Sequence, residues 1–118
     1  MTKRFNRTAY APLLTELLEA VLDYNRQTAP LARSGAAKRV DKARNKIIAA
    51  EDDLKAKANR LERKLLPFDA LPEEERPPGY RIGQENWIAL LETYEALWAG
   101  RKCIDLLRPT VADSEEAA

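Results

Sequence analysis

The chain of 118 residues contains no histidine, one cysteine (Cys103) and only four glycines. Histidine is the commonest general base and the commonest metal ligand, so the usual side chain for both roles is missing. One cysteine allows no internal disulfide, and without histidine it cannot complete an ordinary structural zinc site. The sequence also has no Gly-rich phosphate-binding loop and no nucleophile elbow. We therefore expect a protein that is not an enzyme and needs no cofactor or metal ion.

Long hydrophobic runs are missing as well. No apolar stretch approaches the roughly 18 residues that a membrane-spanning helix needs, and no hydrophobic signal core follows the basic residues 1–7. A single cysteine also fits a reducing compartment. These observations predict a protein without a membrane segment and with a cytoplasmic location.

Helix-forming residues dominate what is present. Charged residues make up 33% of the chain, and apolar residues recur at helical spacing in three stretches, which predicts an all-α three-helix bundle. The expected helices span residues 11–27, 36–66 and 84–107. Residues 1–109 would form a single helical domain, and residues 110–118 an acidic flexible tail.

The longest expected helix, residues 36–66, contains neither proline nor glycine. Ser34 or Gly35 would start it, and Pro67 would end it. Its apolar residues form a narrow seam with a seven-residue repeat, consisting of Val40, Ala43, Ile47, Ala50, Leu54, Ala58, Leu61 and Leu65.

Length suggests a partner for this helix. At 1.5 Å per residue it would span about 46 Å, against about 26 Å and about 36 Å for its two neighbours. One neighbour could not cover it, so the seam predicts a homodimer.

Charge is distributed unevenly along the chain. Residues 36–66 carry ten basic and five acidic side chains, whereas residues 67–118 carry five basic and eleven acidic ones. The cations of the long helix fall into two clusters, residues 38–46 and 55–64. They are separated by the acidic residues 51–53, which we expect to be solvated surface.

The basic clusters have two interpretations. They could bind a polyanion, or they could be a solvated face that pairs with the acidic second half. No aromatic residue lies within residues 36–66, so nucleic acid would be contacted through its backbone rather than by base stacking. The candidate polyanion-binding residues are Lys38, Arg39, Lys42, Lys46, Lys57, Arg60, Arg63 and Lys64.

The connection at residues 67–83 holds four of the seven prolines. We expect an irregular segment with one helical turn near residues 72–76 and apolar side chains that anchor it to the core. The segment 77–80 matches the short Pro-Pro-x-Tyr pattern that WW domains bind, although a plain turn is the favoured interpretation. The candidate partner-binding residues here are Phe68, Glu73, Glu74, Glu75, Tyr80 and Arg81.

Two further expectations concern the remaining polar residues. Arg4 and Arg7 precede the first helix and belong to an end that we expect to fray, although either could contact phosphate. Cys103 is expected to be a packed thiol on or beside the buried face of the third helix.

These features favour a small, non-catalytic helical binding module that engages an acidic partner through its basic helix. The partner would be a nucleic-acid backbone or an acidic protein surface. The alternative is an inhibitor or protein-interaction module, of the kind that phages often encode, which acts through the 67–83 connection and exposed helix faces. A third hypothesis is a helical oligomer that holds a small anionic ligand near Gly100, Arg101 and Lys102.

Overall fold

The computed structural model describes residues 3–107, and among these residues it contains α-helices and short 3₁₀-helices but no strand. This confirms the all-α class. The predicted tail, residues 110–118, lies outside the described residues. The elements follow one another as η1 (Arg7–Tyr10), α1 (Ala11–Arg26), α2 (Pro30–Asp69), η2 (Glu73–Glu75) and α3 (Tyr80–Asp105).

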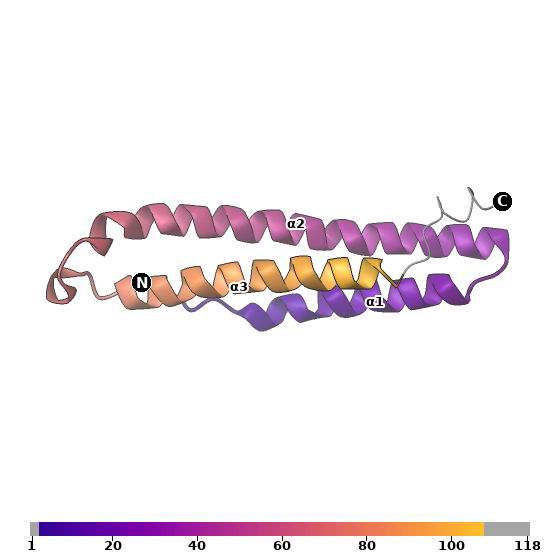
Figure 1. The fold of residues 1–118 in the computed structure, drawn as a ribbon, viewed down its shortest axis with the longest axis horizontal. Helices are drawn as coiled ribbons and strands as arrows, with labels where there is room; N and C mark the ends of the chain where they lie inside the picture. The colour runs from indigo at the N-terminus through magenta and orange to yellow at the C-terminus, as the bar shows by residue number, and fades with distance from the viewer. Residues whose placement is uncertain (1–2, 108–118) are drawn as a thin grey trace.

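The three α-helices run along a common long axis (Figure 1), and the molecule measures 66 × 24 × 16 Å. Helix α2 extends along the whole length, α3 lies beside much of it, and α1 lies only beside the half that contains the start of α2. Within residues 3–107, no helix has a stretch both long enough and apolar enough to cross a bilayer.

Helix α2 starts earlier than predicted, because Pro30 and not Ser34 or Gly35 occupies its first turn. A proline suits this position, since the missing N–H would have no partner within the helix. Ser34 and Gly35 lie inside the helix instead.

The end of α2 also differs from the prediction. Pro67 does not stop the helix, which continues to Asp69. Pro67 lacks the N–H that would bond the carbonyl four residues earlier, and its ring crowds that carbonyl. Only Phe68 and Asp69 follow it in the helix. Helix α3 likewise starts four residues before the predicted Gln84. Its first turn closes through hydrogen bonds from Tyr80 N to the Pro77 carbonyl at 3.0 Å and from Gly83 N to the Gly79 carbonyl at 2.9 Å.

The apolar seam of α2 faces α1 and α3 of the same chain. Val40, Ile47 and Leu54 are fully buried in a core to which α1 contributes Leu17 and α3 contributes Leu97. Because this face is occupied within the chain, it is not available to a second copy. The remaining fully or nearly fully buried members of the core are Val21, Tyr24, Ala36, Ala43, Ala58, Leu90 and Ile104.

Helices α1 and α3 approach each other closely at one point. A Cβ atom on Gly100 would lie 2.8 Å from Cδ1 and 2.9 Å from Cδ2 of Leu14. A glycine at this position therefore lets the Leu14 side chain fill the space against α3.

Candidate functional site

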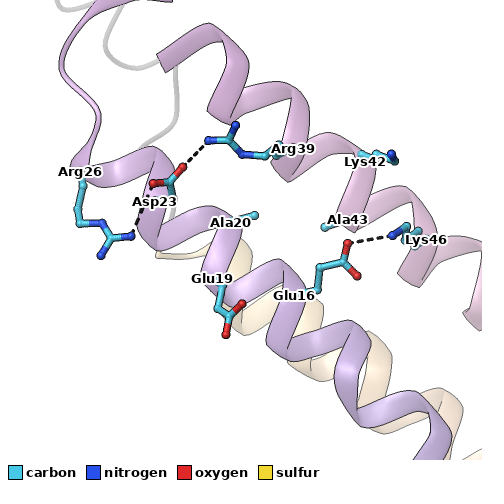
Figure 2. Close-up of a pocket in the computed structure, with 9 residues that line it drawn as sticks. All are labelled: Glu16, Glu19, Ala20, Asp23, Arg26, Arg39, Lys42, Ala43 and Lys46. Carbon is cyan, nitrogen blue, oxygen red and sulfur yellow. Dashed lines mark hydrogen bonds and ion pairs between the residues drawn. The ribbon is translucent and has the colours of Figure 1, made fainter. Parts of the chain in front are cut away.

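The first basic cluster of α2 faces acidic side chains of α1 and α3. Lys46 Nζ lies 2.9 Å from Glu16 Oε1, and Arg39 donates a hydrogen bond to Asp23. Arg44 Nε lies 3.1 Å from Asp105 Oδ2. The first two pairs span a charged groove between α1 and α2, in which the paired side chains point toward one another (Figure 2).

The contacts in this groove change the pKa of the Asp23 carboxyl. The hydrogen bond from Arg39, with a second one from Gln27, lowers the pKa of Asp23 below its ordinary value. In this cluster Lys38 and Lys42 are exposed and make no ion pair with any residue among 3–107, whereas Arg39 and Lys46 are largely neutralised.

The second basic cluster has a different environment. Lys57 pairs with Asp53 of its own helix at 2.9 Å, and this hydrogen-bonded carboxylate raises the pKa of Lys57. Within the part of the chain that the structure describes, Arg60, Arg63 and Lys64 are exposed and form no ion pair. Arg63 only donates a 3.4 Å hydrogen bond to the backbone carbonyl of Asn59.

The position of α1 explains this difference. Glu16 faces Lys46 and Asp23 faces Arg39, so α1 runs antiparallel to α2 and starts, at Ala11, well short of residue 60. No acidic face of α1 therefore reaches the second cluster. Residues 57, 60 and 64 follow helical spacing and lie on one side of α2.

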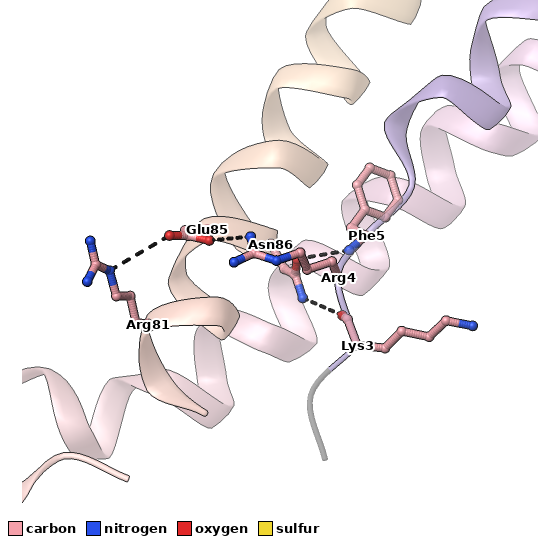
Figure 3. A network of polar contacts seen from close by, with 6 residues as sticks. All are labelled: Lys3, Arg4, Phe5, Arg81, Glu85 and Asn86. Carbon is pink, nitrogen blue, oxygen red and sulfur yellow. Dashed lines mark hydrogen bonds and ion pairs between the residues drawn. The ribbon is translucent and has the colours of Figure 1, made fainter. Parts of the chain in front are cut away.

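The N-terminal segment, residues 3–5, is attached to α3 and does not follow the expectation of a frayed end (Figure 3). Asn86 donates a 2.7 Å hydrogen bond to the Lys3 carbonyl and accepts one of 2.9 Å from Phe5 N. Arg4 pairs with Glu85 at 2.7 Å, and two turns further along α3 Arg7 pairs with Glu92 at 3.2 Å.

The attached segment lies on α3 at about the level, along the long axis, of the second cluster. Gly83 packs against Leu65, since a Cβ built on it would lie 3.0 Å from Leu65 Cδ2. Asn86 follows one turn later on α3, so it lies at about the level of Leu61. The exposed Lys3, held by Asn86, is therefore placed near the level of Arg60 and not beside α1.

The 67–83 connection is held by Arg76. Its Nε donates to the Leu71 carbonyl at 3.1 Å, its Nη2 donates to the Asp69 carbonyl at 3.0 Å, and its guanidinium lies 4.7 Å from the ring centroid of Tyr80. The Tyr80 hydroxyl donates to Asp69, a bond that raises the pKa of Tyr80. Tyr80 is only 6% exposed, so the Pro-Pro-x-Tyr segment does not present its tyrosine to a WW domain.

Other candidates in the connection lie apart from Tyr80. Glu73, Glu74 and Glu75 form the exposed turn η2, as the predicted helical turn near residues 72–76 required. Arg81 is exposed and approaches Glu85 at 3.8 Å, whereas Phe68 is half-buried. The three glutamates thus lie on the surface, whereas Tyr80 is buried and Phe68 is half-buried.

The sequence predicted that Glu51 is solvated surface, and this prediction was wrong. It is buried and accepts two hydrogen bonds from the buried Arg101, at 2.7 Å from Nε and 3.0 Å from Nη2. This carboxylate raises the pKa of Arg101. Arg101 is therefore occupied by Glu51, which removes the central cation of the anionic-ligand site suggested near Gly100 and Lys102.

The environment of Cys103 differs from the prediction. Cys103 is exposed, so the prediction of a packed thiol was wrong: it lies on the side of α3 away from the helix core. Among residues 3–107, no group of three or more histidine, cysteine or acidic side chains could hold a metal ion.

Sequence reasoning missed two contacts between distant parts of the chain. The amide of Asn86 gave no signal, because nothing in the local sequence links it to residues 3–5. The pair of Glu51 and Arg101 had a weak signal, since Glu51 continues the i, i+4, i+7 spacing of the seam from Ile47 to Leu54. Comparison with models of known protein families, with curated proteins and with solved structures finds no match.

Proposed function

We propose that this protein is a small non-catalytic binding module that engages an acidic partner through the second basic cluster of α2. The proposal treats the three helices as one bundle in which α2 presents the basic face. The observation that carries it is the contrast between two clusters on one helix. In the first cluster Arg39, Arg44 and Lys46 are paired with α1 or α3, and Lys38 and Lys42 are not. In the second cluster no ion pair reaches another helix, and Arg60, Arg63 and Lys64 are exposed without an ion pair among residues 3–107.

Electrostatics favours an extended anion at this surface. Cations without local counter-ions attract a polyanion and release its condensed ions on binding, which makes the affinity fall with salt. Lys57 shares its charge with Asp53. Because arginine and lysine at helical spacing contact phosphate without reading base edges, binding to nucleic acid would not be sequence-specific. An acidic protein surface satisfies the same chemistry.

The test measures the binding of a fluorescently labelled DNA duplex by anisotropy between about 50 and 200 mM salt. Three phosphate contacts give a slope of about −2.7 in log K against log salt, which is a loss of about 40-fold over this range. The double substitution Arg60→Glu with Lys64→Glu should reduce binding at low salt at least tenfold. An anionic polypeptide such as poly-glutamate serves as the second probe and separates a nucleic-acid partner from an acidic protein partner.

A matched control carries the same charge change in the first cluster. Lys38→Glu with Lys42→Glu alters two exposed cations that lie in the part of α2 beside the acidic residues of α1, so a smaller loss is expected. Circular dichroism verifies that both double variants remain helical. Absence of binding to both probes at 50 mM salt, or equal losses in the two variants, would refute the proposal.

A second candidate function rests on the 67–83 connection. The contacts of Arg76 hold the chain so that Glu73, Glu74 and Glu75 project as a fixed acidic turn. Such a turn suits an inhibitor or protein-interaction module of the phage type that blocks a basic site on its target. Under this alternative, substitution of the three glutamates by glutamine abolishes capture of a protein partner, whereas Arg60→Glu with Lys64→Glu leaves it intact.

The setting we propose is the cytoplasm, and the support for it is the single Cys103 in a chain without other cysteines. We also retain the proposal of a homodimer, although the seam of α2 is buried within the chain. The dimer must therefore use a different face.

A further inference from the structure

One side of α3 carries large apolar side chains and two charges. Leu91, at the start of this side, is half-buried and packs against the core with part of its surface. The residues of this side follow one another at spacings of four, three, four and four, so they form a stripe along the helix. Trp98 is 46% exposed and Leu106 is 85% exposed. From the start of the stripe to its end, the residues are Leu91, Glu95, Trp98, Lys102 and Leu106.

The two charges of this stripe have no counter-ion in the part of the chain that the structure describes. Neither Glu95 nor Lys102 forms an ion pair with a residue among 3–107, and the Lys102 ammonium lies 5.7 Å from the centroid of the Trp98 ring. Seven residues of helix separate Glu95 from Lys102 by about 10 Å, too far for a direct ion pair. The two side chains therefore remain as an acid and a base at opposite sides of an exposed tryptophan.

The order of residues in the stripe is self-complementary. From Leu91 to Leu106 the residues are apolar, acidic, aromatic, basic and apolar. In the reverse direction the apolar and aromatic positions are the same, and the acidic and basic positions are exchanged. When a second copy of α3 is laid antiparallel across a two-fold axis near Trp98, Glu95 faces Lys102 of the second copy and Leu91 faces its Leu106. The two Trp98 rings then lie next to the axis.

We propose that the stripe Leu91–Glu95–Trp98–Lys102–Leu106 is an isologous interface through which two copies of this chain associate in antiparallel orientation. Such a two-fold contact uses the same patch on both copies, which is the arrangement that a self-complementary pattern fits. A parallel arrangement would place Glu95 against Glu95 and Lys102 against Lys102, and like charges repel. The orientation is therefore determined by the charges, and the apolar residues supply the burial.

The size of the stripe limits its strength. From Leu91 to Leu106 it spans about 23 Å along the helix, so the contact belongs to the small and reversible class of interfaces. Association is expected at micromolar to submillimolar concentrations of protein. This interface is separate from the second basic cluster, which lies on α2, so its failure and that of the proposed polyanion binding are distinguishable.

The test is sedimentation equilibrium of the full chain over a range of concentrations. The apparent mass of the wild type should rise from 13.4 kDa toward twice this value. Glu95→Lys alone and Lys102→Glu alone should each weaken the association at least about tenfold, because each places like charges opposite one another. The double exchange, Glu95→Lys with Lys102→Glu, should restore it.

The rescue by the double exchange is the decisive result. Within a single chain the two residues are too far apart for the exchange to restore an ion pair, so only an intermolecular contact explains a recovery. Glu19→Lys serves as a matched control, since it makes the same charge change on an exposed position of α1 and should leave the association unchanged. A wild-type chain that stays monomeric up to about 0.5 mM, or a double variant no better than the single ones, overturns the proposal.

Discussion

Glu51 of α2 and Arg101 of α3 form a buried, two-point ion pair, with Nε and Nη2 of the arginine 2.7 Å and 3.0 Å from the two carboxylate oxygens. Their side chains are 6% and 8% exposed. Each group therefore depends on the other for its charge compensation, and the pair defines which residues of the two helices stand opposite each other.

Removal of one partner should strongly destabilise the fold. Glu51→Ala leaves the Arg101 guanidinium buried without a counter-ion, which typically costs about 3–5 kcal/mol. Urea unfolding followed by circular dichroism measures the loss. The control is Asp52→Ala at the neighbouring position. Because Asp52 is exposed, this substitution should change the free energy of unfolding by less than about 0.5 kcal/mol.

The double variant Glu51→Leu with Arg101→Met extends this test. Replacement of both charges by apolar groups removes the desolvation penalty along with the attraction, so it should cost less than Glu51→Ala alone. If Glu51→Ala costs no more than Asp52→Ala, the pair is not desolvated in solution.

Gly100 should tolerate a larger side chain only when Leu14 is shortened. In Gly100→Val the added atoms collide with the Leu14 methyl groups, and such overpacking usually costs about 1–3 kcal/mol. Leu14→Ala in the same chain should recover part of this loss, which a double-mutant cycle quantifies. The control is Ala99→Val, since Ala99 is exposed and reports only the weaker helix propensity of valine. Equal effects of the two valine substitutions would contradict the close contact.

Acid should remove the contribution of Asp23 to stability. Because its hydrogen bonds to Arg39 and then Gln27 lower the pKa in the folded state, the unfolded chain takes up this proton first. The stabilisation is therefore fully present above the ordinary value of 3.8 and disappears as the pH falls through the lowered folded value.

The pH dependence can be measured by comparing Asp23→Asn with the wild type. The difference in unfolding free energy should be constant near neutral pH and shrink below about pH 4, and carboxyl NMR should give a midpoint below 3.8 for Asp23. A midpoint at or above 3.8 would mean that Arg39 does not hold the carboxylate in solution.

Local patterns were sufficient for the helices but not for their ends. The apolar spacing from Leu13 to Leu22 predicted α1 to within one residue at its C-terminus. The start of α2 was placed too late, because Ser34 and Gly35 resemble a helix start while Pro30 suits one equally well. The apolar pattern does not indicate whether the helix ends at Pro67 or continues for a few residues beyond it.

The surface was harder to predict, because charge pairing depends on which helices become neighbours. The basic residues from 38 to 46 and from 55 to 64 have the same composition signal, yet only the first group meets α1. Glu51 and Cys103 were assigned to the wrong environments for a related reason. Glu51 finds a partner fifty residues away, and Cys103 lies on the flank of α3 that no other helix covers.

The attachment of residues 3–5 to α3 has a consequence for how the chain is made. Phe5 and its hydrogen-bond partner Asn86 are 81 residues apart, and at roughly 5–20 residues per second a ribosome needs roughly 4–16 s to synthesise the intervening chain. During these seconds α1 and α2 can pair, but the side chains that hold Lys3, Arg4 and Phe5 do not yet exist. Residues 3–5 therefore wait for the later synthesis of α3 before they can make their native contacts.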